Sequence, residues 1–113
     1  MKSATSWAKT LLQGEPGGLE ELRVHEFVDD ETAHDDEQIE RLRREFSAEV
    51  DRVQKELASE YGPPSRTGES DDSIIPFSGV FRFAVWEVGG SQLFVAAAFE
   101  DRGAPILLMI GTA

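Results

Sequence analysis

The sequence contains no cysteine, which excludes disulfide bonds, thiolate metal sites and thiol catalysis. It also lacks a long hydrophobic run: the longest, Leu93 to Phe99, has seven residues, whereas a membrane-spanning helix needs about 20. Residues 1–13 carry Lys2 and Lys9 but no apolar stretch typical of a signal peptide. We therefore expect a soluble, cytoplasmic protein.

Positive charge is scarce. The 113 residues include 22 Asp and Glu but only 11 Lys and Arg, which gives a formal net charge of −11. Such a charge repels nucleic acids and anionic membranes and attracts basic surfaces. We therefore expect a basic protein partner and neither a nucleic acid nor a membrane, with plain solubility as the alternative reason for the charge.

Motifs for catalysis or cofactor binding are missing as well. His25 and His34 are the only histidines, and their separation does not match the spacing of a zinc site. The Gly-x-Ser-x-Gly nucleophile motif, the dinucleotide-binding glycine pattern and the phosphate-binding loop are all absent. We therefore predict no enzyme activity, no catalytic residue, no metal ligand and no cofactor.

The length fits a single domain over residues 1–113. The strongest pattern predicts one long amphipathic helix over 36–61, with Asp35 as its N-cap and Gly62 at its end. Its predicted apolar face is Ile39, Leu42, Phe46, Val50, Val53, Leu57 and Tyr61. A short helix over 3–13 and a strand over about 19–28 precede it, and a long loop over 62–79 follows.

The last third predicts a three-stranded antiparallel meander, with strands over 80–88, 91–100 and 105–110. The Gly89-Gly90 pair marks a tight turn between the first two. The resulting prediction is an α+β fold: short N-terminal helix, strand, long amphipathic helix, and a meander packed on that helix.

A two-residue turn fixes the register of the first hairpin. Val88 should face Ser91, Trp86 Leu93, Phe83 Ala96 and Phe81 Ala98. One face then holds Phe81, Phe83, Val85, Phe94, Ala96 and Ala98, and we expect it to lie under the long helix. The other face holds Val80, Ala84, Trp86, Val88, Leu93, Val95, Ala97 and Phe99, interrupted by Arg82.

The second face is therefore apolar too, and something must cover it. The alternatives are the N-terminal helix through Trp7 and Leu11, a second copy of the chain, or another protein. Arg82 and Trp86 are residue types that dominate the binding energy of protein interfaces.

Two acidic clusters are the other candidate binding features. Residues 29–37 hold six carboxylates, and Glu69-Ser70-Asp71-Asp72 form a second group. The run over 29–37 fits a helix N-terminus, a patch for a basic partner, or a hard-cation site that lacks the EF-hand pattern. The predicted partner-binding residues are Asp29, Asp30, Glu31, Asp35, Asp36, Glu37, Glu69, Asp71, Asp72, Arg82 and Trp86.

With its acidic clusters and terminal hairpin over 80–100, the whole chain resembles the immunity proteins of bacterial polymorphic toxins in style, although it matches no defining motif. The resemblance implies a protein that binds a toxin domain, often a basic nuclease, and blocks its active site by charge and shape. The first function hypothesis is therefore an acidic inhibitor that neutralises a basic toxin or effector.

Two further functions remain open. A secretion or effector chaperone would also be small and acidic and would form a homodimer through the second face of the sheet. A small-ligand-binding domain would use a pocket between helix and sheet, with Tyr61, Trp86 and the His25-Glu26 pair as first candidates.

Overall fold

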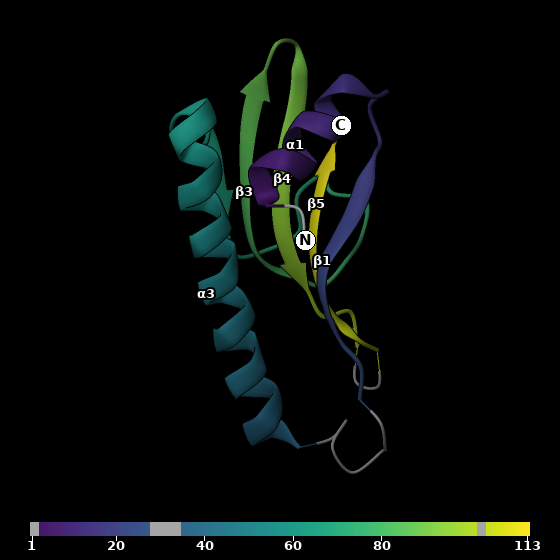
Figure 1. The fold of residues 1–113 in the computed structure, drawn as a ribbon. Helices are drawn as coiled ribbons and strands as arrows, with labels where there is room; N and C mark the ends of the chain where they lie inside the picture. Colours follow the sequence, from purple (N-terminus) through teal and green to yellow (C-terminus); the bar gives the residue numbers. More distant parts are fainter. Residues whose placement is uncertain (1–2, 28–34, 102–103) are drawn as a thin grey trace.

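The computed structural model describes residues 3–27, 35–101 and 104–113. Helices and strands follow one another as α1 (Ala4–Gln13), β1 (Leu19–His25), α3 (Asp36–Tyr61), β2 (Arg66–Gly68), β3 (Val80–Val88), β4 (Ser91–Ala98) and β5 (Ile106–Thr112). Neither described helix combines the length and the apolar character that crossing a bilayer requires. The α+β fold class is confirmed: in the described part of the chain, two helices lie beside one antiparallel sheet (Figure 1).

Both helices begin and end where local chemistry favours it. The Asp35 side chain accepts a hydrogen bond from the backbone N–H of Gln38 at 3.2 Å, so Asp35 is the N-cap of α3 as predicted. At the other end Gly62 has a φ of 80°, and its N–H donates to the Ala58 carbonyl. The side chains that α3 buries are Ile39, Leu42, Phe46, Val50, Val53 and Leu57.

The sheet has five strands in the order β1-β5-β4-β3-β2, and every adjacent pair is antiparallel. The predicted strand and the three-stranded meander are present, but the prediction lacked β2. This strand has only three residues, and it pairs with Phe83–Val85 of β3. It lies inside the segment 62–79 that was expected to be a loop throughout.

The register of the β3–β4 hairpin follows the turn only part of the way. Val88 pairs with Ser91 and Trp86 with Leu93, as predicted, but Ala98 pairs with Val80 rather than with Phe81. A bulge between Val80 and Arg82 causes the difference, because one extra residue reverses the side that the preceding residues face.

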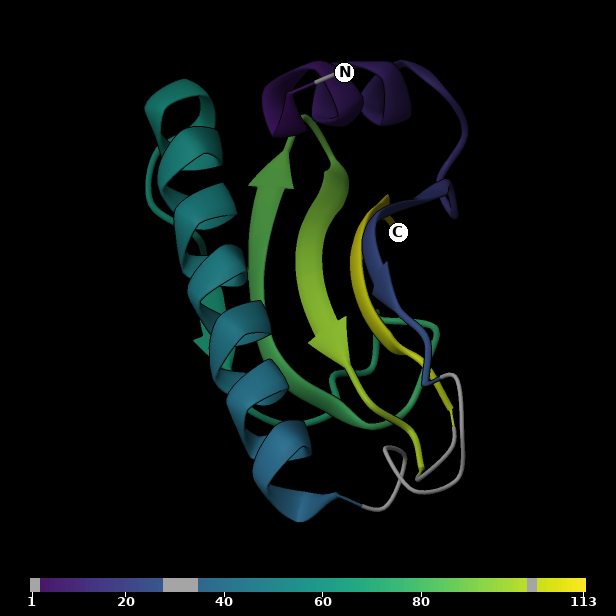
Figure 2. The same ribbon diagram turned by 60° about the horizontal axis from the view of Figure 1, so that its bottom comes forward.

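The helices cover the face of the sheet opposite to the one predicted. α1 and α3 pack on Ala84, Trp86, Leu93, Val95 and Ala97, together with Phe81, which the bulge turns toward them. Figure 2 shows α3 running beside β3 while α1 crosses the end of the sheet. The prediction failed because both faces of the hairpin are apolar, so the alternation of side chains could not show which one receives a helix.

The face of the hairpin that was predicted to lie under α3 is instead covered by the segment before β3. We call residues 69–79 the strap; it passes behind the sheet, on the side away from α3 (Figures 1 and 2). Ile74, Ile75 and Phe77 of the strap form a second apolar cluster with the sheet. Their partners in the sheet are Val80, Phe83, Val85, Phe94, Ala96 and Ala98.

Of the three covers considered for the face that holds Trp86, the structure shows the N-terminal helix, because Trp7 and Leu11 of α1 pack there together with α3. The strap covers the opposite face, where α3 was expected. A homodimer through the face that holds Trp86 no longer has an open surface on β3 and β4 to use.

Candidate functional site

A groove with carboxylates on both sides runs between α3 and the ends of β3 and β4. It consists of two adjoining open hollows of about 530 and 400 Å³, which share Glu40 and Arg43. We call it the acidic groove. Its charged lining residues are Asp36, Glu40, Asp51, Glu69, Glu100, Asp101, Arg43 and Arg44. Among the described residues, six carboxylates against these two arginines and the neighbouring Arg82 leave the surface acidic.

Elements that are distant in the sequence build the two sides. α3 supplies three of the carboxylates, at steps that keep them along one flank of the helix. Glu69 comes from the first residue of the strap, and Glu100 and Asp101 follow the end of β4. The groove therefore exists only in the folded chain, because no sequence segment carries both of its sides.

Arg82 ties the two sides together at one end of the acidic groove. Its Nη2 donates to Asp51 Oδ1 at 2.7 Å, and its Nη1 donates to Glu69 Oε1 at 3.2 Å. The hydrogen bond with Asp51 raises the pKa of the Arg82 guanidinium above its ordinary value. Arg82 thus holds Asp51 and Glu69 in place and offsets part of their charge.

The floor of the acidic groove is apolar. Phe81 and Ile39 are buried beneath it, and the half-buried Phe99 continues it toward Glu100. The guanidinium carbon of Arg43 lies 4.9 Å from the centre of the Phe81 ring, a cation–π contact. Carboxylates above an apolar floor suit lysine or arginine side chains, which place their methylene stems on apolar surface and their charge at the rim.

The structure brings part of the first predicted acidic cluster to this groove. Asp36 lines it, whereas Asp35 and Glu37 line a separate hollow beside Arg41 and Arg44. Asp35 also has a structural role as the N-cap of α3. The predicted residues Asp29, Asp30 and Glu31, and His34 with them, lie outside the described residues.

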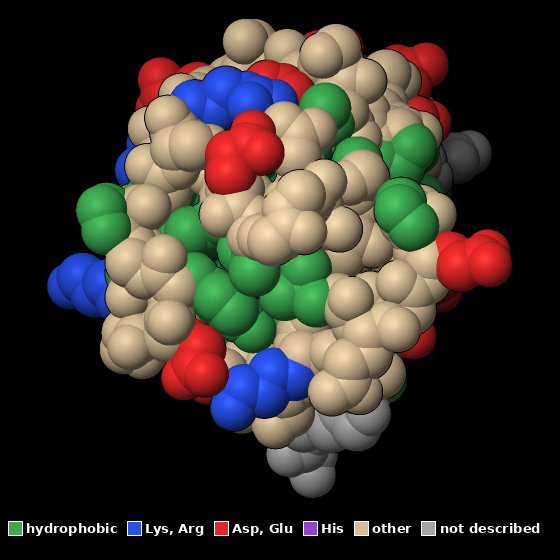
Figure 3. All heavy atoms as spheres, turned by 90° about the horizontal axis from the view of Figure 1, so that it is seen from above, with side chains coloured by type: hydrophobic (Ala, Val, Ile, Leu, Met, Phe, Trp, Pro, Cys, Tyr) green, Lys and Arg blue, Asp and Glu red, His purple; other side chains and the backbone are tan. Residues whose placement is uncertain are grey.

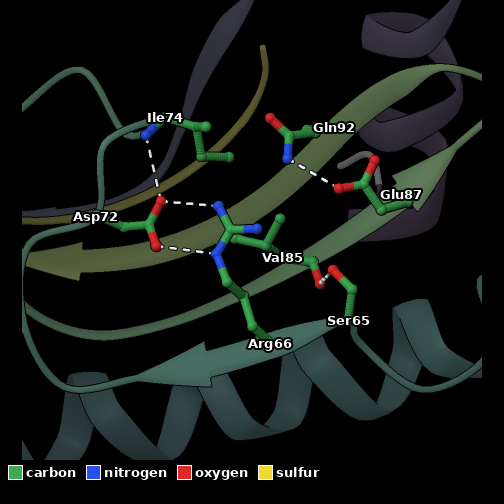
Figure 4. A network of polar contacts seen from close by, with 7 residues as sticks. All are labelled: Ser65, Arg66, Asp72, Ile74, Val85, Glu87 and Gln92. Atoms are coloured by element: carbon green, nitrogen blue, oxygen red, sulfur yellow. Dashed lines mark hydrogen bonds and ion pairs between the residues drawn. The ribbon is translucent and has the colours of Figure 1, made fainter.

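Only one residue of the second predicted cluster lines the acidic groove, and the other two carboxylates form structural hydrogen bonds. Glu69 lines the groove, but Asp71 accepts a hydrogen bond from the Val80 backbone N–H at 2.9 Å. Asp72 faces Arg66 of β2, as Figure 4 shows, and accepts from its Nε at 3.0 Å and its Nη2 at 2.9 Å. Asp71 and Asp72 thus anchor the strap to the sheet.

Asp72 is the stronger of the two anchors. Its side chain is 13% exposed, and its Oδ1 also accepts a hydrogen bond from the Ile74 backbone N–H at 3.2 Å. The hydrogen bond from Arg66 is the main reason that the pKa of Asp72 lies below its ordinary value, and the bond from Ile74 lowers it further. The carboxylate is therefore held ionised by the contacts that fix the strap.

Trp86 is a core residue and offers no surface to a partner. It is 1% exposed, and its Nε1 donates to the Gly62 carbonyl at 2.9 Å. The expectation that Trp86 lies at an interface was wrong, because it rested on an uncovered sheet face. That face carries the helices.

The acidic groove also contains residues that sequence reasoning missed, chiefly Glu40, Asp51, Glu100 and Asp101. Glu40 and Asp51 lie outside the apolar face of the predicted helix, and Glu100 and Asp101 lie at the end of the predicted strand over 91–100. A helical projection places Asp36, Glu40 and Arg43 on one flank. No sequence signal shows which part of the sheet that flank faces.

The residues suggested for a small-ligand pocket do not line the hollow that lies between the helices and the sheet. A hollow of about 350 Å³ between α1, α3, β1 and β5 is lined by Ser3, Ala4, Leu22, Glu49, Arg52, Val53, Glu56 and Leu108. Tyr61, Trp86 and His25 are not among them. The His25 ring instead packs edge-on against Phe27, with ring centres 5.0 Å apart, and burial raises the pKa of Tyr61.

One end of the molecule carries an apolar surface. Figure 3 looks down on the end formed by α1, the last turn of α3 and the β3–β4 turn, and hydrophobic side chains gather near its middle. The half-buried side chains of these elements include Trp7, Tyr61 and Val88. The Lys9–Glu60 ion pair, at 3.4 Å, joins α1 to α3 at this end.

Within residues 3–27, 35–101 and 104–113, no group of three or more His, Asp or Glu side chains is placed to hold a metal ion. Comparison of the chain with protein-family models, curated proteins and solved structures found no match.

Proposed function

We propose that the chain is a non-enzymatic protein-binding module, an acidic inhibitor of the immunity type that neutralises a basic toxin or effector. The observation that supports this most is the acidic groove. It gathers carboxylates from α3, the strap and the end of β4 above an apolar floor. A basic loop or helix of a partner would lay a lysine or arginine stem on the half-buried Phe99 and its charges against the carboxylates.

The charge of the whole chain supports the same function. A formal net charge of −11 attracts a basic partner over a long distance, and the acidic groove is the surface at which that partner would bind. The Arg82 ion pairs hold Asp51 and Glu69 before any partner arrives, so less ordering entropy is lost on binding.

The test uses the product of the gene next to the one that encodes this chain. We expect that product to stop growth when it is expressed alone in a bacterial host, and co-expression of this chain to restore growth. The groove variant Glu40→Gln/Glu69→Gln should lose most of the protection. It should also bind the purified product on the order of tenfold more weakly, mainly through slower association.

The matched control is Glu15→Gln/Glu56→Gln, which changes the net charge equally at exposed positions outside the acidic groove. It should protect like the unmodified chain, and salt should weaken binding of the unmodified chain more than binding of the groove variant. A neighbouring product without toxicity, or equal protection by both double variants, would contradict the proposal.

A further inference from the structure

The strand β1 leaves one long edge of the sheet open. In the order β1-β5-β4-β3-β2 it pairs only with β5, and Figures 1 and 2 show no described strand beyond it. β1 has seven residues, whereas the strand at the other edge, β2, has three. The outward backbone groups of such an edge can hydrogen-bond an added extended segment.

The only large hydrophobic side chains that are exposed in the described chain both lie on this edge strand. Leu19 is 37% exposed and Val24 is 38% exposed. They pair with Gly111 and Leu107 of β5, and a cross-strand pair shares a face. Both therefore point to the face away from α3, because the helix-facing cluster takes the alternate β5 residues such as Leu108.

Acidic side chains alternate with these two along the strand. Glu21 pairs with Met109, so it points to the same face as Leu19 and Val24 and lies between them. Glu20 pairs with Ile110 and faces the other side. The open edge thus presents apolar, acidic and apolar side chains in succession on one face, with a further carboxylate behind.

The acidic and apolar side chains on this edge favour one kind of binding partner over another. Pairing of two copies of β1 would bring together two chains that each carry a net charge of −11. Charge repulsion between the two chains opposes this pairing. A basic segment has the opposite effect, because a lysine or arginine beside Glu21 gains an ion pair and a flanking valine or isoleucine covers Leu19 or Val24.

We propose that the open edge of β1 accepts an extended basic segment of a partner protein as an additional strand. On the face shared with Leu19, Glu21 and Val24, the segment carries one basic side chain beside Glu21 and an apolar side chain two residues to either side of it, beside Leu19 and Val24. This edge lies at the margin of the sheet opposite β2, so the inference does not rest on the acidic groove.

The experiment uses the intact chain and three synthetic nine-residue peptides. The first has lysine at its centre, valine two residues to either side and threonine at the other positions. The second replaces the lysine with glutamate, and the third is the lysine peptide with every second backbone nitrogen methylated. At millimolar concentration the lysine peptide should shift the backbone amide resonances of residues 19–25 and slow their exchange with solvent. The glutamate and methylated peptides should bind at least about tenfold more weakly, since one lacks the charge and the other the backbone donors.

Charge reversal locates the site. Glu21→Lys should weaken binding of the lysine peptide about tenfold and strengthen that of the glutamate peptide. Glu40→Lys, which makes the same charge change in the acidic groove, should leave the shifts in β1 unaltered.

Three results would overturn the inference: lysine-peptide shifts confined to the groove, equal binding of the methylated peptide, or a peptide-free dimer whose β1 amides are already protected. The proposal for the acidic groove is tested independently, because its test involves Glu40 and Glu69 and not Glu21.

Discussion

Replacement of Asp72 by asparagine tests the idea that an ion pair fixes the strap to the sheet. Asparagine keeps the size of the side chain but removes the charge that holds two guanidinium nitrogens of Arg66, at 3.0 and 2.9 Å. It also weakens the acceptor for the Ile74 backbone N–H. The strap covers the face of the hairpin opposite to α3, so a weaker anchor should show as lower stability of the whole domain.

The expected magnitude follows from how far the pair is exposed. A hydrogen bond to a charged group contributes about 1.5–3 kcal/mol when buried, whereas an exposed ion pair contributes about 0–1 kcal/mol. The side chain of Asp72 is 13% exposed and that of Arg66 is 38% exposed, which places the pair between these limits. We therefore expect Asp72→Asn to lower the free energy of unfolding by about 1–2 kcal/mol, or the melting temperature by roughly 4–8 °C.

The difference should depend on pH in a defined direction. The hydrogen bond from Arg66 lowers the pKa of Asp72 in the folded chain, so the unfolded chain binds a proton at higher pH than the folded chain does. The stabilisation is therefore complete above the ordinary aspartate pKa of about 4. It is lost as the pH falls from there toward the lowered value. The gap between the unmodified chain and Asp72→Asn should be largest near neutral pH and should narrow below about pH 4.

Urea unfolding followed by circular dichroism at a series of pH values measures this gap. Glu15→Gln makes the same change in net charge at an exposed loop position and serves as the control. Hydrogen exchange adds a local measurement, since the Ile74 amide should exchange faster in Asp72→Asn. The reasoning is refuted if Asp72→Asn is as stable as Glu15→Gln, or if the gap at pH 3 equals the gap at pH 7.

Three further substitutions test other contacts by urea or thermal unfolding. Trp86→Phe removes the hydrogen bond to the Gly62 carbonyl and should lower the free energy of unfolding by about 1–3 kcal/mol. Binding of a partner by the folded fraction should stay unchanged. A loss of binding by protein that is still folded would mean that Trp86 contacts the partner. Phe46→Ala opens a cavity under α3 at a fully buried position and should cost about 3–5 kcal/mol; a loss below about 1 kcal/mol would mean that α3 packs elsewhere. Gly79→Ala should cost more than Gly90→Ala although both glycines have positive φ, because a Cβ at 79 would lie 2.4 Å from a backbone oxygen and one at 90 meets nothing within 4 Å; equal losses would contradict this packing.

Local signals predicted the helices and the turn well. The recurrence of apolar residues gave α3 its bounds, and Asp35 and Gly62 act at its two ends through contacts with the next or preceding turn. The Gly89-Gly90 turn set the hairpin register as far as Arg82. These features depend on neighbours a few residues away, which a sequence displays directly.

The predictions of the fold were wrong where contacts between segments that are distant in the sequence determine the structure. Alternation separated the two faces of the hairpin, yet both were apolar, so only packing could assign one to α3 and the other to the strap. The bulge between Val80 and Arg82 contains no glycine or proline, so the sequence gives no signal for it. β2 has no alternation of its own, and its pairing depends on β3 already being in place.

The candidate site was predicted only in part for the same reason. Sequence clusters drew attention to Asp36 and Glu69, which do line the acidic groove, but also to Asp71 and Asp72, which anchor the strap. Runs of acidic residues show local charge density. They do not show which carboxylates accept hydrogen bonds from backbone N–H groups in the folded chain.

The position of β5 has a consequence for how the protein is made. β5 is the last strand along the chain, yet it lies between β1 and β4 in the sheet. While a ribosome is still adding residues 26–105, β1 has no strand to pair with, a wait of several seconds at about 5–20 residues per second. We expect the sheet to close only after this segment has left the exit tunnel, so that nascent chains halted before Ile106 remain open to proteolysis within residues 19–25.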